Sequence, residues 1–173
     1  MVLLALLLIR FGQHAQLPAA LLAGLYWPQQ AVAGLGLGLL LGGGSLVSAL
    51  HKPSAESVRR TAESYGRLNL DGLNPVWVAL AAGAGEEMLF RAALQPMLGI
   101  WFTSLLFLAL HARAYDFRRL DRTALLQAAS VFGMSVVFGL VYSYLGLLAA
   151  VIAHAVIDIL GLYAVRHIVA MSK

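Results

Sequence analysis

The sequence contains no cysteine and few charged residues. Without a thiol, the protein has no disulfide, no cysteine nucleophile and no cysteine-ligated metal site. Charged residues make up 12% of the 173 positions and hydrophobic residues 61%, whereas roughly a quarter of a soluble domain is charged. The composition therefore predicts an integral membrane protein, in which any chemistry comes from Glu, Asp, His, Ser, Thr or Tyr side chains or from a bound cofactor.

Basic residues are concentrated in two loops, and the net charge is +4. The two groups are Lys52, Arg59, Arg60 and Arg67 in the first loop and Arg113, Arg118, Arg119 and Arg122 in the second. This clustering follows the positive-inside rule and does not resemble the folded basic domain that binds nucleic acids. We therefore expect cytoplasmic basic loops and termini, no nucleic-acid partner and, because organelle signals are absent, a prokaryotic inner membrane.

About six apolar stretches approach the length of about 20 residues that a spanning helix needs. The clear ones are residues 29–50, 74–94, the returning helix that ends at His111, 123–144 and 147–170. Residues 1–27 are interrupted by polar side chains after Ile9, and we expect them to form one imperfect span, or else an interfacial piece followed by a re-entrant one. The predicted fold is all-α, a polytopic membrane helical bundle in a single domain, 1–173.

This domain is expected to have two parts. Residues 1–73 would form two N-terminal spans and an amphipathic cytoplasmic loop, and residues 74–170 would form a four-helix core. The many glycines of the 29–50 span favour close packing between helices in lipid. They do not indicate a phosphate-binding loop, because the Lys-Ser/Thr ending and the strand context are missing.

The 74–94 span carries charges where charges are costly, in the run Gly85-Glu86-Glu87-Met88-Leu89-Phe90-Arg91. An ionisable group inside a membrane helix is a functional candidate by default, because it costs at least about 2 kcal/mol unless it is paired or faces water. Glu87 and Arg91 are four residues apart and can form an ion pair on one helix face. Glu86 has Phe90 at its i+4 position instead, which leaves its carboxylate free for chemistry.

Other ionisable residues lie at a similar depth in the predicted membrane helices. Counted from the two short outer turns at about 1.5 Å per residue, four side chains lie roughly 12 to 20 Å deep: Glu86, His111, His154 and Asp158. His154 and Asp158 share a helix face, and Phe107 stands one turn before His111. We therefore expect these side chains to meet in one site.

Three motifs in order carry a family resemblance: Glu86-Glu87-x-x-x-Arg91, Phe107-x-x-x-His111 and His154-x-x-x-Asp158. They resemble the motifs of the CPBP intramembrane protease family, which includes the CAAX prenyl endopeptidases and bacteriocin-processing or self-immunity relatives. The similarity covers about residues 74–165. It implies a glutamate-dependent endopeptidase that acts in the lipid bilayer on a membrane-embedded or lipid-anchored peptide or protein, with no cofactor, and that the 74–170 core is catalytic.

The family roles transfer to matching positions of this sequence. The resemblance implies that Glu86 is the general base that activates water, and that His111 orients Glu86 or shares its proton. His154 and Asp158 would hold the oxyanion of the tetrahedral intermediate. The supporting residues would be Glu87, Arg91 and Phe107.

Asp158 departs from the family pattern, because relatives often carry asparagine at this position. An ionised carboxylate would repel an oxyanion, so Asp158 must either be protonated or have another role. We expect Asp158 to fix the tautomer of His154.

Two other functions are compatible with the sequence. A zinc-dependent membrane protease could use Glu86, His111, His154 and Asp158 as ligands, although the chain lacks the His-Glu-x-x-His spacing. A non-catalytic immunity or scaffold protein could instead bind another membrane protein through its glycine-rich helix. A transporter is less favoured, since the sequence shows no evident repeat and no pair of broken helices.

Overall fold

The computed structural model describes residues 1–112 and 121–171. Within these residues the chain is helical, and the only strand-like pairing is one backbone bridge between Gly24 and Gly146. The elements are α1 (Val2–Leu7), η1 (Leu8–Gly12), α2 (Leu17–Leu21), α3 (Trp27–His51), α4 (Glu56–Tyr65), α5 (Asn74–Glu87), η2 (Met88–Leu94), α6 (Gln95–His111), α7 (Arg122–Tyr144) and α8 (Leu147–Met171), where η denotes a π-helical segment. The predicted all-α fold is confirmed.

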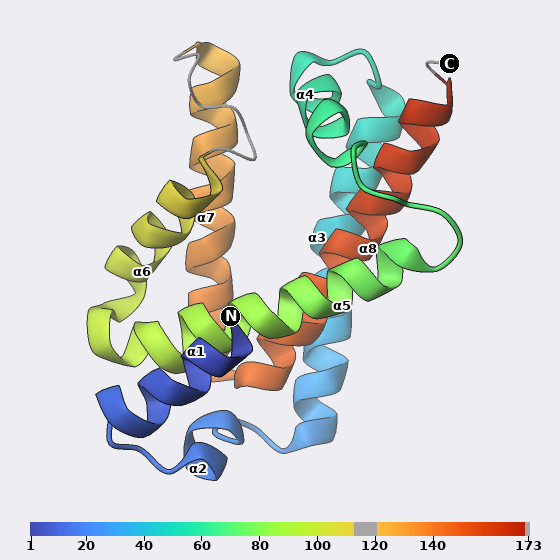
Figure 1. Cartoon of the computed structure of the whole chain (residues 1–173). Helices are drawn as coiled ribbons and strands as arrows, with labels where there is room; N and C mark the ends of the chain where they lie inside the picture. The colour runs from blue at the N-terminus through green and yellow to red at the C-terminus, as the bar shows by residue number, and fades with distance from the viewer. Residues whose placement is uncertain (113–120, 172–173) are drawn as a thin grey trace.

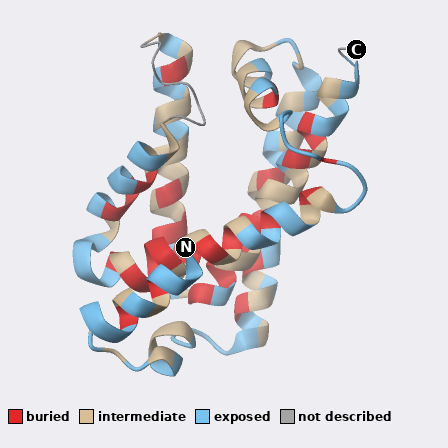
Figure 2. Ribbon diagram, viewed as in Figure 1, coloured by how far each residue is buried: buried red, intermediate tan, exposed pale blue. Residues whose placement is uncertain are grey.

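The helices form two flanks that meet at a central crossing (Figure 1). In one flank α3 and α8 run side by side, and α6 and α7 form the other. α5 and η2 cross obliquely between the flanks, and α1 packs along η2. Buried residues are concentrated at this crossing, in the lower half of the view (Figure 2). The core of the molecule therefore lies where the helices cross.

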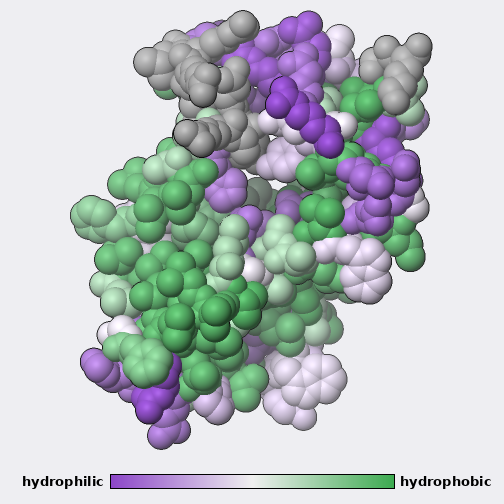
Figure 3. Space-filling view, in the orientation of Figure 1, coloured by the Kyte–Doolittle hydropathy of each residue, from purple (hydrophilic) through white to green (hydrophobic). Residues whose placement is uncertain are grey.

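The surface and the helix lengths are those of an integral membrane protein. Hydrophilic residues gather at the top of the view, around α4, and hydrophobic residues cover most of the surface below them (Figure 3). In the described part of the chain, 4 helical stretches are long and apolar enough to cross a membrane. These stretches are Trp27–His51, Asn74–His111, Arg122–Tyr144 and Leu147–Met171.

The expected count of about six spans is not confirmed. Residues Asn74–His111 form one helical stretch, which is bent at Gly99, where the backbone has φ 74° and ψ 167°. Because glycine has no Cβ, it adopts such a positive φ without strain. This bend lets the rest of α6 pack against α7. The turn expected between the 74–94 span and the helix that ends at His111 is therefore present, but inside one helical stretch.

Residues 1–27 do not form the single imperfect span that we expected. Their apolar helix, Val2–Gly12, is too short to cross a membrane. The break that follows it is stabilised by Gln13, whose side-chain amide donates to the carbonyl oxygens of Ala92 and Ala93 in η2 at 2.8 and 2.6 Å. One of the polar residues that interrupt this apolar run, Gln13, therefore contacts the core, and the segment packs on η2.

The basic first loop, the start of α7 and the end of α8 lie on the same side of the molecule (Figure 1). Arg113, Arg118 and Arg119 of the second basic group, and the C-terminal Lys173, lie outside the described residues. The first residue does not lie on this side. A Cβ placed on Gly85 of α5 would lie 3.5 Å from the Met1 side chain, so Met1 lies against the middle of the bundle.

α4 connects the two flanks on this polar side. Ala62 and its neighbours pack against Leu162 and Val165 of α8. On the other side of α4, Arg60 donates to the carboxylate of Asp121, just before α7, at 2.6 Å. The hydrogen bond from Arg60 holds the pKa of Asp121 below its usual range, and the same bond raises the pKa of Arg60. α4 therefore contacts α8 through apolar side chains and α7 through charged ones.

Glycines permit the close approach of α3 to α8. Gly34, Gly38 and Gly42 are buried, and a Cβ on Gly38 would lie only 2.7 Å from the Cβ of Val156 in α8. Gly36 faces away from this contact, since a Cβ there would meet nothing within 4 Å. Small residues at such an interface let helices pack by van der Waals contact where lipid provides no hydrophobic drive.

We predict that Gly38→Ala destabilises the protein and that Gly36→Ala does not. The added methyl group overpacks the α3–α8 contact in the first variant, which costs about 1–3 kcal/mol, whereas in the second it only improves helix propensity, by up to about 1 kcal/mol. Thermal unfolding of both variants in the same detergent measures the difference. Equal Tm values for the two would contradict the assigned packing face.

Candidate active site

The two consecutive glutamates lie where the regular helix ends. α5 ends at Glu87 and continues directly as the π-helical segment η2 from Met88, although the sequence predicted a uniform α-helix here. π-Helical turns inserted in α-helices frequently occur at functional sites. This junction lies at the central crossing, so both carboxylates face neighbouring helices.

Glu87 and Arg91 form the ion pair that their spacing predicted. Arg91 Nε lies 3.1 Å from Glu87 Oε2, and the exposed fraction of both side chains is 0%. Arg91 Nη2 donates to the hydroxyl of Ser135 on α7 at 2.8 Å. Since removing each ion from water costs several kcal/mol, this pair persists only because the surrounding helices hold both partners in place.

Glu86 lies between two histidines that come from different helices. Its Oε2 atom is 3.6 Å from Nε2 of His111 and 3.9 Å from Nε2 of His154. His111 is oriented by its own helix, because its Nδ1 lies 2.9 Å from the carbonyl oxygen of Phe107 and the two rings stack at 4.1 Å. When Nδ1–H donates to that carbonyl, Nε2 is left facing Glu86. Both imidazoles thus approach the same carboxylate oxygen.

His154 is held by two other elements. Its Nδ1 lies 2.7 Å from Glu87 Oε1, so one oxygen of Glu87 contacts His154 and the other contacts Arg91. The ring of Phe138 on α7 stacks on the imidazole with a centroid distance of 4.9 Å and an interplanar angle of 8°. Glu87 is therefore more than a partner for Arg91, because it also orients His154.

Asp158 does not make the contact that would fix the tautomer of His154, contrary to our expectation. Its Oδ2 lies 3.5 Å from Nε2, whereas the closer contact, at 2.7 Å, joins Nδ1 to Glu87. The reason is the position of the two carboxylates. Glu87 is fully buried beneath the imidazole, whereas the Asp158 side chain is 36% exposed and lines the space above it.

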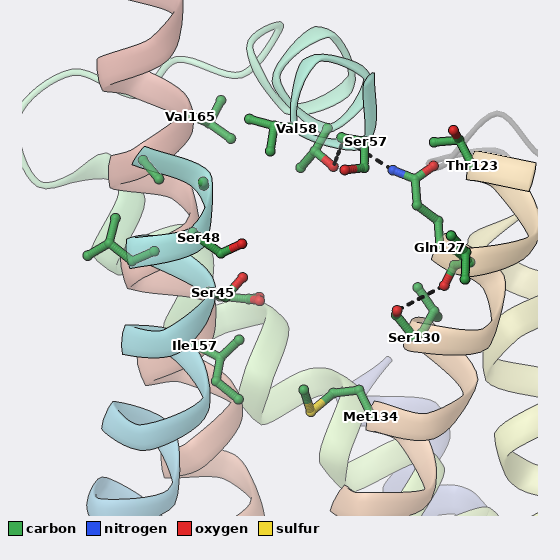
Figure 4. Close-up of a pocket in the computed structure, with 18 of the residues that line it drawn as sticks. Ser45, Ser48, Ser57, Val58, Thr123, Gln127, Ser130, Met134, Ile157 and Val165 are labelled. Carbon is green, nitrogen blue, oxygen red and sulfur yellow. Dashed lines mark hydrogen bonds between the residues drawn. The ribbon is translucent and has the colours of Figure 1, made fainter. Parts of the chain in front are cut away.

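A cavity of about 700 Å³ lies above the cluster, between α3, α7 and α8 and below α4. Residues at its base include Phe107, Ser135, Phe138, His154 and Asp158. Figure 4 shows Ser45 and Ser48 of α3 facing Gln127 and Ser130 of α7 across this cavity. The cavity walls thus carry hydroxyl and amide groups, of which Ser130 and Gln127 donate to the backbone carbonyls of Leu126 and Ser57.

The structure brings all seven residues selected from the sequence into one cluster. It adds two that the sequence did not indicate, Ser135 and Phe138 of α7. No motif spacing relates α7 to the other helices, and a phenylalanine in an apolar span is ordinary. The hydroxyl of Ser135 inside that span was the one available signal.

A catalytic zinc ion needs about three protein ligands around one point. Among the residues that the structure describes, no group of three or more His, Asp or Glu side chains could hold a metal ion. The Nδ1 atoms of His154 and His111 contact Glu87 and the Phe107 carbonyl, and their Nε2 atoms face Glu86.

The fold and the cluster define a polytopic membrane protein with a carboxylate–histidine site buried between its helices. A family model described as "Type II CAAX prenyl endopeptidase Rce1-like" matches residues 70–160. This match covers more than half of the chain, which therefore belongs to the Rce1-like family. It confirms the resemblance that the three motifs carried, and it identifies the family as one of proteases.

A relative with no assigned function is also similar. The chain is 38% identical over 84 residues to the uncharacterized protein YpbD of Bacillus subtilis (strain 168), an alignment that covers 48% of this chain and 41% of the relative. The matched part of the chain thus spans less than half of the length of YpbD. No solved structure matches the chain.

We predict that breaking the buried ion pair unfolds or strongly destabilises the protein. Arg91→Met leaves the carboxylate of Glu87 without its cation, which should cost about 3–5 kcal/mol. The double variant Glu87→Gln/Arg91→Met removes both charges, while the glutamine oxygen can still accept from His154, so part of the stability should return. Unfolding in detergent measures both effects.

The surface pair Arg59–Glu63 is the control, because its side chains are 62% and 68% exposed. Glu63→Gln should change stability by less than about 1 kcal/mol. If Arg91→Met lowers the free energy of unfolding by as little as Glu63→Gln does, the buried pair is not a structural requirement.

Proposed function

We propose that the protein is an intramembrane endopeptidase of the glutamic type, which hydrolyses a peptide bond of a membrane-associated or lipid-anchored peptide or protein. The observation that supports this most directly is the convergence of two histidine Nε2 atoms on one oxygen of Glu86. A carboxylate with an adjacent imidazole is a suitable group for activating water by general-base catalysis.

Glu86 and His111 would activate the water. With Nδ1–H bound to the Phe107 carbonyl, the His111 Nε2 lone pair and the Glu86 carboxylate are two acceptors 3.6 Å apart. A water molecule can donate one hydrogen bond to each of these acceptors. Glu86 then takes a proton from the water as the water oxygen attacks the substrate carbonyl carbon. Glu86 passes this proton to the leaving amine when the tetrahedral intermediate collapses.

His154 would stabilise the oxyanion. Glu87 accepts a hydrogen bond from Nδ1, which directs Nε2 toward Glu86 and Asp158. When Nε2 carries a proton, it is a donor at the base of the cavity, where negative charge develops on the substrate oxygen. Phe138 and Phe107 cover the rings, which keeps water away from the hydrogen bonds and strengthens them.

The cavity would admit the substrate from the side on which α4 lies. By the positive-inside rule this side is cytoplasmic, in a prokaryotic inner membrane. Because a peptide bond within a regular helix has its polar groups satisfied internally, the substrate must be extended at the cleaved bond. The hydroxyl and amide groups of the cavity walls are suitable partners for an extended backbone.

We predict that Glu86→Gln abolishes cleavage of membrane-anchored peptides and leaves the fold intact. Loss of the general base should lower kcat about 10²- to 10⁴-fold, whereas Glu63→Gln, at the surface, should be fully active. The assay uses a peptide library and purified protein in nanodiscs, with and without a chelator. Activity that is lost on chelation would assign the site to a metal, and peptide binding without cleavage by the wild type would favour a non-catalytic binding protein.

We predict that Asp158→Asn retains cleavage within about 10-fold, whereas Asp158→Leu loses about 10²-fold or more. Asparagine can accept from Nε2 of His154 and can also donate to the oxyanion, so the negative charge is dispensable at this position. Steady-state kinetics of the two variants measure the difference. If Asp158→Asn lowers the cleavage rate as much as Asp158→Leu does, the carboxylate itself is required.

A further inference from the structure

We propose that α7 is a positioning element of the active site, in which Phe138 fixes the plane of the His154 ring and Ser135 fixes the Arg91–Glu87 pair that holds its Nδ1. This inference rests on the proposed function, and it assigns to α7 a role in addition to that of the three motif-bearing helices. Both residues act through other side chains and not on the substrate.

The two histidines of the site make the same kinds of contact, but the contacts come from different helices. His111 has one nitrogen bound to a carbonyl and one face against Phe107, both on its own helix. His154 has one nitrogen bound to Glu87 and one face against Phe138. On α8 itself, Asp158 approaches the ring, with Oδ2 3.5 Å from Nε2, but neither the partner of Nδ1 nor the stacked aromatic ring belongs to α8. α7 is the helix that supplies the stacked ring.

A hydrogen bond alone does not fix an imidazole. Glu87 contacts Nδ1, and Asp158 and Glu86 approach Nε2 at 3.5 and 3.9 Å, but these contacts act on the ring nitrogens and not on the ring faces. Phe138 opposes tilting of the ring, because its own ring lies 8° from parallel to the imidazole and is buried, with 3% exposed. Nε2 is then directed toward Glu86, where an error of about 1 Å can cost 10²-fold in rate.

Ser135 acts on the same histidine by a second route. It lies three residues before Phe138, on the same face of α7, and its hydroxyl accepts a hydrogen bond from Arg91 Nη2. Arg91 contacts one oxygen of Glu87, and the other oxygen contacts His154. α7 therefore constrains His154 both at its face and, through this chain of hydrogen bonds, at its Nδ1.

The first test compares Phe138→Leu with Phe138→Tyr. Leucine keeps an apolar group but removes the flat ring, so kcat should fall about 10- to 100-fold while KM changes little. Tyrosine keeps the ring and should restore kcat. The control is Val141→Ala on the same helix, a buried residue that packs against Ala149 and Ala150. It should lower stability without lowering kcat.

The second test does not depend on activity. In protein labelled with carbon-13 at histidine rings, the stacked Phe138 ring should shift the His154 ring protons upfield. This shift should disappear in Phe138→Leu, persist in Phe138→Tyr and leave His111 unchanged. Ser135→Ala should alter the His154 signal as well, since it loosens Arg91 and Glu87.

The outcomes separate this proposal from the proposed function. An unchanged kcat in Phe138→Leu, or equal losses in the leucine and tyrosine variants at equal stability, overturns the role of Phe138 even if Glu86→Gln is inactive. Absence of peptide cleavage by the wild type overturns the proposed function, and the His154 signal then still decides whether α7 positions the ring. A His154 signal that is identical in all variants refutes the positioning role.

Discussion

The structure depends on one buried ion pair, between Glu87 and Arg91. Both side chains are withdrawn from water, and an isolated charge in that position would be prohibitively costly. The pair is tolerated because each partner has a further contact, Glu87 to His154 and Arg91 to Ser135. These contacts require α5, η2, α7 and α8 to cross at one point, so the polar cluster and the apolar core specify the same arrangement.

At this crossing the two adjacent glutamates have different surroundings. Glu87 faces inward and is used by the structure, whereas Glu86 lies one residue earlier, with its carboxylate beside two Nε2 atoms, one of them on His154, which lines the cavity. The same rotation of about 100° per residue that buries one carboxylate turns the other toward the two imidazoles. A single helix junction thereby supplies both the anchor of the site and its candidate base.

Much of this could be predicted from the sequence, because the relevant information is local. The hydropathy of the long spans, the i and i+4 pairing of Glu87 with Arg91 and the stacking of Phe107 on His111 all follow from helix geometry. The single span expected for residues 1–27 is not confirmed, because hydropathy does not show that Gln13 binds the Ala92 and Ala93 carbonyls of η2. The predicted number of spans exceeds the number of long helical stretches for a related reason. Two predicted spans form one stretch, Asn74–His111, which Gly99 bends but does not end.

The sequence by itself determined that the protein is a helical membrane protein of this family, and it indicated the carboxylates and histidines of the candidate site, because these depend on composition and on spacing within single helices. Only the tertiary structure decided that Glu87, and not Asp158, orients His154. It also decided that α7 contributes Ser135 and Phe138. Contacts between helices depend on crossing angles and on depth in the bundle, and no spacing within one helix encodes them.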